Sequence, residues 1–216
     1  MKRREIKSAR GKDRQSGSSA QHVMPKNWPP EITYLRSPVY SNKLTSSELS
    51  YLRATDPSME QAQAATLITP RTPPVKICLI TSPGNHPALH QHGLFATRYL
   101  PPGSFILDYL GLYHSEPSIS DYDLSLSRDL GIGIDAAAMG NEGRFINDYR
   151  GIRDGPNAEF RERMVGSERR MGVWVLPVGK SGRGKGVGKG EEICVSYGKG
   201  FWKGREKEAK ADGDCE

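Results

Sequence analysis

The sequence predicts a mostly β domain with an irregular, partly helical N-terminal extension. Its 216 residues are enough for one domain with a hydrophobic core plus extensions. From Val75 onward, short apolar segments recur between Gly and Pro residues, a pattern typical of short strands joined by turns. Before Val75, prolines alternate with aromatic residues and helix-start signals. We therefore expect small β-sheets with few helices.

Composition divides the chain into four parts. The first lacks large apolar residues almost entirely and is rich in Ser, Gly and Gln, so we expect it to be disordered. The parts are 1–26, a basic tail; 27–74, an extension that packs on the domain; 75–205, the domain itself, with a flexible Gly- and Lys-rich loop at 180–190; and 206–216, a charged C-terminal tail.

The extension carries signals for a docked segment and two helices. Prolines alternate with aromatic residues over 28–40, which indicates an extended segment that packs on the domain. The sequence TSSE at 45–48 has the residues of a capping box and predicts a short helix through Leu52. Asp56-Pro57 supplies an N-cap and a first-turn proline for a second helix that ends near Leu67.

Four segments of the domain have the composition of strands. Each is short, apolar and rich in β-branched or aromatic residues, and Pro101-Pro102-Gly103 forms the turn between the middle two. The segments are 75–80, 93–98, 104–109 and 172–178. Residues 114–139 show no clear period, and we expect an inserted loop or a short helix there.

The positive charge of the chain is concentrated in two segments. The formal net charge is +6, but residues 1–16 carry +5 and residues 180–190 carry +4, so the remainder is slightly negative. The surplus therefore lies in a tail and a loop, which argues against direct nucleic-acid binding by the folded core. A basic nucleic-acid-associated protein that uses these two segments remains an alternative.

The chain shows no sign of a membrane protein or a secreted protein. No apolar run approaches the ~20 residues that span a bilayer, and the N-terminus lacks the apolar core of a signal peptide. Cys78, Cys194 and Cys215 are far apart and odd in number, which favours a reducing intracellular compartment. The KRRE run at 2–5 is either a nuclear address, which we expect, or part of a solvated tail.

A histidine cluster is the one candidate for a metal site. His86, His90 and His92 follow an H-x3-H-x-H spacing, and neutral imidazoles bind zinc or iron. No carboxylate or thiolate lies nearby to complete a ligand set, so we expect no metal. Their more common role would be a polar segment leading into Gly93. No Gly-x-Ser-x-Gly elbow appears, and hydrolase chemistry has little support.

Four stretches carry the functional information. They are HQHGLFAT at 90–97, ILDYLG at 106–111, GRFINDY at 143–149 followed by PN at 156–157, and GEEICVSYG at 190–198. In this order they resemble the SET-domain family of S-adenosylmethionine-dependent protein lysine methyltransferases. The resemblance covers about 75–205. It implies small curved β-sheets and a knot-like crossing of the last two motifs near the C-terminus, which ordinary connection rules would not predict.

The resemblance implies a catalytic role for two tyrosines. Tyr197 matches the final Tyr-Gly tyrosine of the family and would be the catalytic residue, while Tyr109 matches Tyr-x-Gly and would supply the second hydroxyl of a lysine channel. Tyrosine suits such a channel, because its ring forms an apolar wall and its hydroxyl orients the amine. Without the resemblance, both would be read as core tyrosines with satisfied hydroxyls.

The resemblance also implies a site for S-adenosylmethionine. Asn147 would hold the methionine end, Arg144 would support the asparagine turn, and Phe201 or Trp202 would stack on the adenine or close the lysine channel. The residues implied for the cofactor are His90, Gln91, His92, Gly93, Arg144, Asn147, Asp148 and Trp202. Phe201 and Val195 are assigned to the substrate channel.

The chain departs from the family pattern at three of these positions. Gln91 replaces a glycine, which restricts close backbone approach to the cofactor. Asp148 replaces a histidine and places a carboxylate near the adenine pocket. Val195 stands where many members have the Phe or Tyr that limits the number of methyl groups, so the product state is not readable from the sequence.

The function that the sequence favours is protein lysine methylation. The substrate would be a histone tail or a lysine of a non-histone protein, attracted by acidic residues such as Asp121, Asp123 and Asp129. A SET-shaped binding or scaffold module that has lost catalysis is the alternative that Gln91 and Asp148 motivate.

Overall fold

A computed structural model describes residues 24–54, 72–179, 184–198 and 200–202 of the chain. The second expected helix, most of the basic tail, the C-terminal tail and part of the Gly- and Lys-rich loop lie outside these residues. No helix of the described part is long and apolar enough to cross a membrane.

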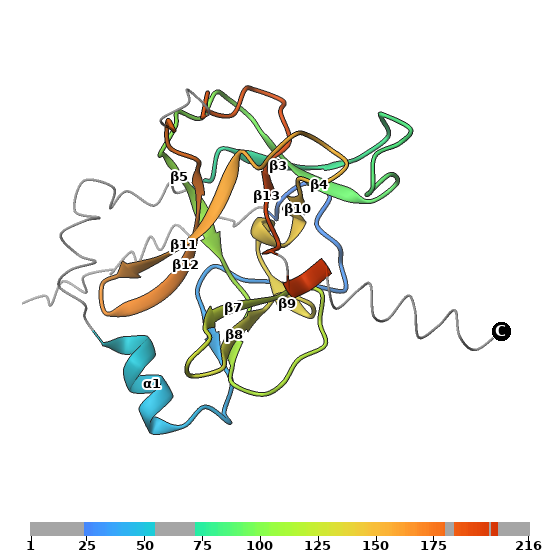
Figure 1. The fold of residues 1–216 in the computed structure, drawn as a ribbon. Helices are drawn as coiled ribbons and strands as arrows, with labels where there is room; N and C mark the ends of the chain where they lie inside the picture. Colours follow the sequence, from blue (N-terminus) through green and yellow to red (C-terminus); the bar gives the residue numbers. More distant parts are fainter. Residues whose placement is uncertain (1–23, 55–71, 180–183, 199, 203–216) are drawn as a thin grey trace, which may run out of the picture.

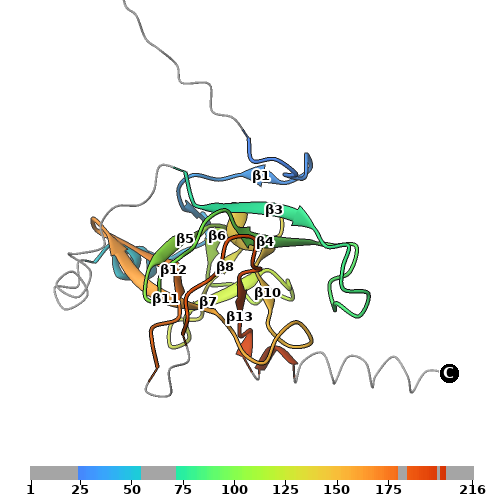
Figure 2. The same ribbon diagram turned by 90° about the horizontal axis from the view of Figure 1, so that it is seen from above.

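The described strands form five small sheets, so the expectation of a mostly β fold is confirmed (Figures 1 and 2). Strand order is β11-β12-β5 in one sheet and β2-β6-β8-β7 in another, and three two-stranded sheets complete the set: β1-β9, β3-β4 and β10-β13. The strands are β1 (Thr33–Tyr34), β2 (Val39–Tyr40), β3 (Val75–Leu79), β4 (His92–Ala96), β5 (Phe105–Tyr109), β6 (Leu112–His114), β7 (Asp123–Ser127), β8 (Ile132–Asp135), β9 (Met139–Gly140), β10 (Asn147–Asp148), β11 (Ala158–Val165), β12 (Glu168–Val175) and β13 (Cys194–Val195).

The N-terminal extension is joined to the domain by strand pairing. β1 pairs in parallel with β9, and β2 pairs in parallel with β6. The helix α1 (Ser46–Arg53) begins at Thr45, whose side chain accepts from the Glu48 N–H while the Glu48 carboxylate accepts from Thr45. This is the expected capping box. Leu52 is fully buried in the second core cluster, and Leu49 and Tyr51 of the same helix pack against that cluster.

Residues 114–139 contain the strands β7 and β8, so the expectation of only an inserted loop or a short helix there was wrong. β7 and β8 pair antiparallel, and β8 also pairs with β6. The buried side chains Leu126, Ile132 and Ile134 hold these strands on the core. These strands are hard to predict because Ser, Asp and Gly stand between their apolar residues, and Asp and Gly are depleted in strands.

The hairpin of β11 and β12 was also underestimated, because only 172–178 was expected to be a strand. The two strands pair over eight residue pairs, and β12 then pairs with β5 (Figure 1). The charged residues of this hairpin interrupt the apolar pattern by which a strand is predicted from a sequence. Arg163 and Arg169 are buried, although arginine is rarely buried without a partner.

The apolar core has two clusters that meet at the β5 strand. The first contains Leu94, Ile106, Phe145, Val173, Ile193 and Val195, among others, and the second contains Leu52, Tyr109, Tyr113, Ile134 and Met171, among others. Side chains of β5 enter both clusters, and all five of its residues are buried. The β5 strand therefore joins the two clusters, and its last residue, Tyr109, belongs to the second.

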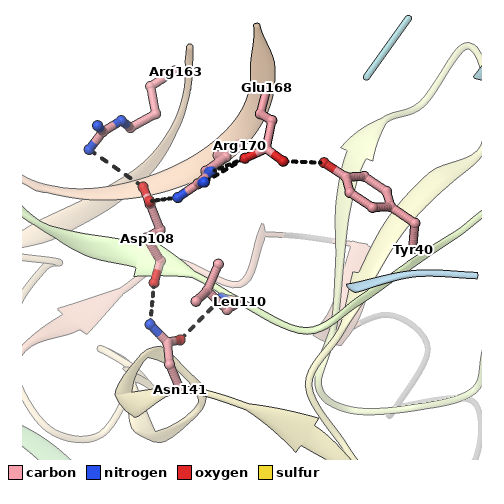
Figure 3. Close-up of polar contacts among 7 residues, drawn as sticks. All are labelled: Tyr40, Asp108, Leu110, Asn141, Arg163, Glu168 and Arg170. Carbon is pink, nitrogen blue, oxygen red and sulfur yellow. Dashed lines mark hydrogen bonds and ion pairs between the residues drawn. The ribbon is translucent and has the colours of Figure 1, made fainter. Parts of the chain in front are cut away.

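Asp108 precedes Tyr109 and is the centre of a buried charge network (Figure 3). Its carboxylate lies 3.0 Å from Arg170 Nη1 and 3.5 Å from Arg163 Nη1, and Arg170 continues to Glu168. The backbone oxygen of Asp108 accepts from the Asn141 amide at 2.7 Å. Burial tends to lower the pKa of the Arg163 guanidinium, and Asp108 opposes that shift. The network thus balances one buried carboxylate against two buried cations.

Replacing Asp108 with Asn should lower the free energy of unfolding by about 3 kcal/mol, because Arg163 and Arg170 would lose a buried anionic partner and Arg170 would keep only Glu168. Urea unfolding followed by circular dichroism measures the change. The control is Glu116→Gln, which breaks an exposed ion pair with Lys43 and should cost less than about 1 kcal/mol. Equal losses in the two variants would contradict a special role for the network.

Candidate active site

One large cavity lies between segments that are far apart in the sequence. Its volume is about 1350 Å³. The β3–β4 loop, β7, the region around β10 and the C-terminal segment all contribute to its wall. Residues from the four functional stretches that line it are Gln91, His92, Tyr109, Arg144, Phe145, Ile146, Asn147, Asp148, Ser196, Tyr197 and Gly198. The cavity thus collects residues from all four stretches.

The last two motifs are held together by what we name the motif junction, residues 147–157 and 191–197. β10 and β13 pair in parallel, with Asn147 opposite Cys194 and Asp148 opposite Val195, and they lie side by side in both views (Figures 1 and 2). The Asn157 amide donates to the Glu192 carbonyl at 2.8 Å and accepts from the Cys194 N–H at 2.8 Å. One asparagine side chain therefore satisfies two backbone groups of the other segment.

Tyr197 is anchored to the opposite motif at both its ends. Its hydroxyl donates to the Ile146 carbonyl at 2.6 Å, and its backbone N–H donates to Asp148 Oδ2 at 2.7 Å. Burial raises the pKa of the phenol, and the charge of Asp148 raises it further. The residue is 36% exposed and lines the cavity. Tyr197 is therefore a neutral hydroxyl with a fixed position at the cavity wall.

Tyr109 supplies a second fixed hydroxyl on the same cavity. It donates to the Tyr122 carbonyl at 2.7 Å, and its ring meets Phe160 edge-on at 5.6 Å. Burial is the main cause that raises the pKa of this phenol, and Tyr197 adds to the effect. Tyr109 and Tyr197 both line this cavity.

Arg144 fixes the loop that carries Tyr122. Its Nε donates to the Ala136 carbonyl at 3.0 Å, and its guanidinium carbon lies 4.3 Å from the centre of the Tyr122 ring. A second cation–π contact reaches Phe145 at 5.1 Å. These described contacts join Arg144 to the β6–β7 loop and to the segment that follows β8, and its support of the asparagine turn stays a prediction.

Asn147 lines the cavity and is held by a carboxylate behind it. Its amide nitrogen donates to Glu192 Oε1 at 2.8 Å. The Gly93 backbone approaches the same carboxylate so closely that a Cβ there would lie 2.7 Å from Glu192 Oε1. Only glycine fits at position 93 without a shift of that side chain.

The remaining residues expected on the cofactor side are placed as follows. Gln91 and His92 line the cavity, whereas His90 lies outside its lining and takes a positive φ of 65° in the bend before β4. Phe201 and Trp202 line the cavity as neighbouring rings, with centres 5.4 Å apart. Val195 is fully buried in β13 and is absent from the lining.

Asp148 is the anchor for the C-terminal segment. Its Oδ2 accepts from Tyr197 N–H and from the Trp202 indole N–H at 3.3 Å, and its Oδ1 accepts from Arg150 N–H at 2.9 Å. The Arg150 guanidinium lies 3.1 Å away and compensates the charge. A buried carboxylate with this many donors is well satisfied. Asp148 thus fastens the aromatic segment to β10.

Neither metal nor thiol chemistry is supported in the described part of the chain. No group of three His, Cys, Asp or Glu residues there could hold a metal ion. His86 instead contacts Glu192 Oε2 at 3.0 Å. Burial raises the pKa of the Cys194 thiol to about 12, with Glu192 adding to the effect, so this thiol does not ionise near neutral pH.

Sequence reasoning missed two residues behind the cavity. Glu192 was visible as the second acid of the Gly-Glu-Glu motif, but its contact with Asn147 depends on the fold. His86 was weighed only as a metal ligand. The position of His86 in the loop before Gly93 is the signal that could have identified its role. Gly93 lies against Glu192, so a polar side chain in this loop can reach the same carboxylate.

Comparisons with known proteins identify the class. The family model of the SET domain matches residues 91–198, which is half of the chain, so the protein belongs to the SET-domain family. A structure of ATXR5 in complex with histone H3.1 mono-methylated on R26 is similar, with a TM-score of 0.52, 16% identity, and coverage of 77% of this chain and 81% of that one. A comparison with curated proteins gave no match.

Structures of polycomb repressive complex 2 from Chaetomium thermophilum also match. One has a TM-score of 0.41 and 28% identity over 51% of this chain and 14% of that chain. Another, in an autoinhibited conformation bound to S-adenosylmethionine, has a TM-score of 0.45 and 24% identity over 64% of this chain and 17% of that chain. The chain therefore spans less than a fifth of these polycomb chains.

Replacing Asp148 with Asn should loosen the C-terminal aromatic segment, because an amide nitrogen would face backbone or indole donors. We expect the fluorescence of Trp202 to become more accessible to acrylamide by at least about 2-fold, since each lost bond to a charged group costs about 1.5–3 kcal/mol. The Trp202→Phe protein identifies the Trp202 signal against Trp28 and Trp174. Unchanged quenching would show that Asp148 does not fasten this segment.

Proposed function

We propose that this protein transfers a methyl group from S-adenosylmethionine to the ε-amine of a lysine in another protein. The observation that carries the proposal is the position of Tyr197, a neutral hydroxyl fixed at a cavity wall beside the motif junction. Membership of the SET-domain family supports the reaction class. The substrate protein and the catalytic activity are parts of the proposal.

The cavity residues fit the chemical groups of S-adenosylmethionine. Asn147 offers an amide oxygen to an ammonium group, and the aromatic rings of Phe201 and Trp202 offer faces on which an adenine could stack. The volume of about 1350 Å³ accommodates a cofactor together with a lysine side chain. When bound, the cofactor supplies a methyl group activated by a sulfonium.

The two tyrosines suit the needs of a lysine acceptor. A lysine ammonium has an ordinary pKa of about 10.4 and must lose a proton before its nitrogen can attack. An apolar channel lowers that pKa, because burial disfavours the charged form. Since burial raises the pKa values of Tyr197 and Tyr109, both phenols stay protonated and add no negative charge that would favour the ammonium.

Catalysis would rest mainly on alignment and on exclusion of water. Alignment of two reactants can supply a large part of a rate enhancement. Tyr197 and Tyr109 are each held by a hydrogen bond to a backbone carbonyl, so their hydroxyl oxygens remain able to accept from an amine. Phe201 and Trp202 lie where they would cover the reacting groups.

The charge of the cavity wall favours a basic substrate. Asp121, Asp123, Asp129 and Glu162 line the side formed by β7 and β11. A disordered basic segment such as a histone tail would be attracted to this side, and its lysine would enter near Tyr109. Action on histones implies a nuclear location, which is likewise part of the proposal. A lysine of a non-histone protein in a basic segment would satisfy the same chemistry.

The Tyr197→Phe variant should reduce kcat for methyl transfer by about 100-fold, as expected for loss of one positioned hydroxyl, with little change in cofactor affinity. Transfer of labelled methyl groups to mixed histones and to a cell extract measures it. Tyr99→Phe is the matched control, since Tyr99 is exposed and bonds only to the Lys185 carbonyl among its described contacts. Full activity of Tyr197→Phe at an unchanged melting temperature would overturn the role of Tyr197.

The Asn147→Ala variant should weaken binding of S-adenosylmethionine by about 10-fold or more, because the amide oxygen would no longer accept from the ammonium. Isothermal titration calorimetry measures the Kd. Asn42→Ala removes an exposed asparagine of the extension and should bind as the wild type does. Absence of binding by the wild type, with an intact fold, would instead favour the scaffold-module alternative.

A further inference from the structure

Behind Asn147 lies a chain of three buried or half-buried polar side chains that starts at His86. His86 Nε2 lies 3.0 Å from Glu192 Oε2, and Glu192 Oε1 accepts from the Asn147 amide at 2.8 Å. His86 is 6% exposed, and the Glu192 side chain is 9% exposed. Of the three residues, only Asn147 lines the cavity.

The backbone sets the tautomer of His86. The N–H of Ala88 donates to His86 Nδ1 at 3.0 Å, so Nδ1 is the acceptor and carries no proton. The proton of the neutral ring is therefore on Nε2, which donates to Glu192. The carboxylate has its two oxygens engaged on different sides, one by the imidazole and the other by the amide.

The orientation of the Asn147 amide follows from this arrangement. A carboxylate only accepts hydrogen bonds, so the side of Asn147 that faces Glu192 must be its NH2 group. The amide oxygen is then the end left to accept from a bound molecule. An isolated asparagine has two amide orientations of similar energy, and Glu192 removes one of them.

We infer that His86 and Glu192 form a positioning relay that fixes the Asn147 amide with its oxygen toward the ammonium group of the cofactor. The inference rests on the proposed function for the identity of that ammonium group. The Glu192 carboxylate lies on the NH2 side of the Asn147 amide. Its negative charge polarises the amide so that the amide oxygen becomes more negative, which favours a bound cation. Neither His86 nor Glu192 touches the cavity, so both act through Asn147.

The Glu192→Gln variant tests the relay at constant side-chain size. Glutamine has one acceptor oxygen, so either the His86 N–H or the Asn147 NH2 would face another donor. We expect the Kd for S-adenosylmethionine to rise by about 10-fold in calorimetry, while kcat at saturating cofactor stays within about 2-fold. Glu116→Gln is the matched control, because Glu116 pairs with Lys43 at the surface and lines no part of the cavity, and its Kd should not change.

A second variant pair guards against a purely structural effect. His86→Gln keeps an N–H donor for Glu192 and should retain most of the affinity, whereas His86→Ala should lose about as much as Glu192→Gln. If His86→Ala and Glu192→Gln lose kcat and cofactor affinity equally, or lower the melting temperature with normal affinity, then His86 and Glu192 only stabilise the fold. Either result would overturn the relay.

A measurement without cofactor separates the relay from the proposed function. Nitrogen-15 NMR of the imidazole, assigned through His86→Gln, should show a neutral ring with its proton on Nε2, and the Asn147 NH2 resonances should shift in Glu192→Gln but not in Glu116→Gln. A proton on Nδ1, or unmoved Asn147 resonances, would overturn the relay. If the wild type binds no S-adenosylmethionine although these NMR results hold, the proposed function fails and the orientation of Asn147 stands.

Discussion

The contact between β10 and β13 is the constraint on which the site depends. These two-residue strands are too short to be stable by themselves, and Asn157 supplements their pairing by bonding the Glu192 carbonyl and the Cys194 N–H. The backbone of Tyr149 also donates to the Val195 carbonyl at 2.9 Å. Asn147 lies in this pairing and Tyr197 follows it by two residues, so the backbone register brings the two residues close, and Asp148 then holds the Tyr197 backbone.

The aspartate at position 148 is explained by what it contacts. In place of the histidine that the family resemblance implied, the chain has a carboxylate that accepts from two backbone N–H groups and from the Trp202 indole. Its charge is compensated by Arg150, whose guanidinium also lies 5.3 Å from the centre of the Trp202 ring. The departure therefore joins the motif junction to the C-terminal aromatic segment, and the carboxylate is engaged by these internal donors.

Local sequence patterns predicted those elements whose residues follow the usual pattern of a helix start or of a strand. The capping box at Thr45 and the apolar strands β3 to β5 are of this kind. The β11–β12 hairpin was poorly predicted because it is rich in charged residues, and the buried Arg163 finds its partner, Asp108, far away in the sequence. The site shows the same limit: ordered motifs identify Asn147 and Tyr197, but His86 acquires its role only when the β3–β4 loop folds onto Glu192.

The charges near the cavity follow one rule that suits the proposed reaction. A free carboxylate beside a lysine amine would raise its pKa and hold it as an unreactive ammonium. Asp108, next to Tyr109, is neutralised by two arginines, and Asp148, next to Tyr197, is compensated by Arg150. The acids Asp121 and Asp129 line the cavity at the two ends of β7, where they can attract a basic segment. In the proposed reaction, this separation would attract a cationic lysine to the β7 side of the cavity and still favour its neutral form between the two tyrosine hydroxyls.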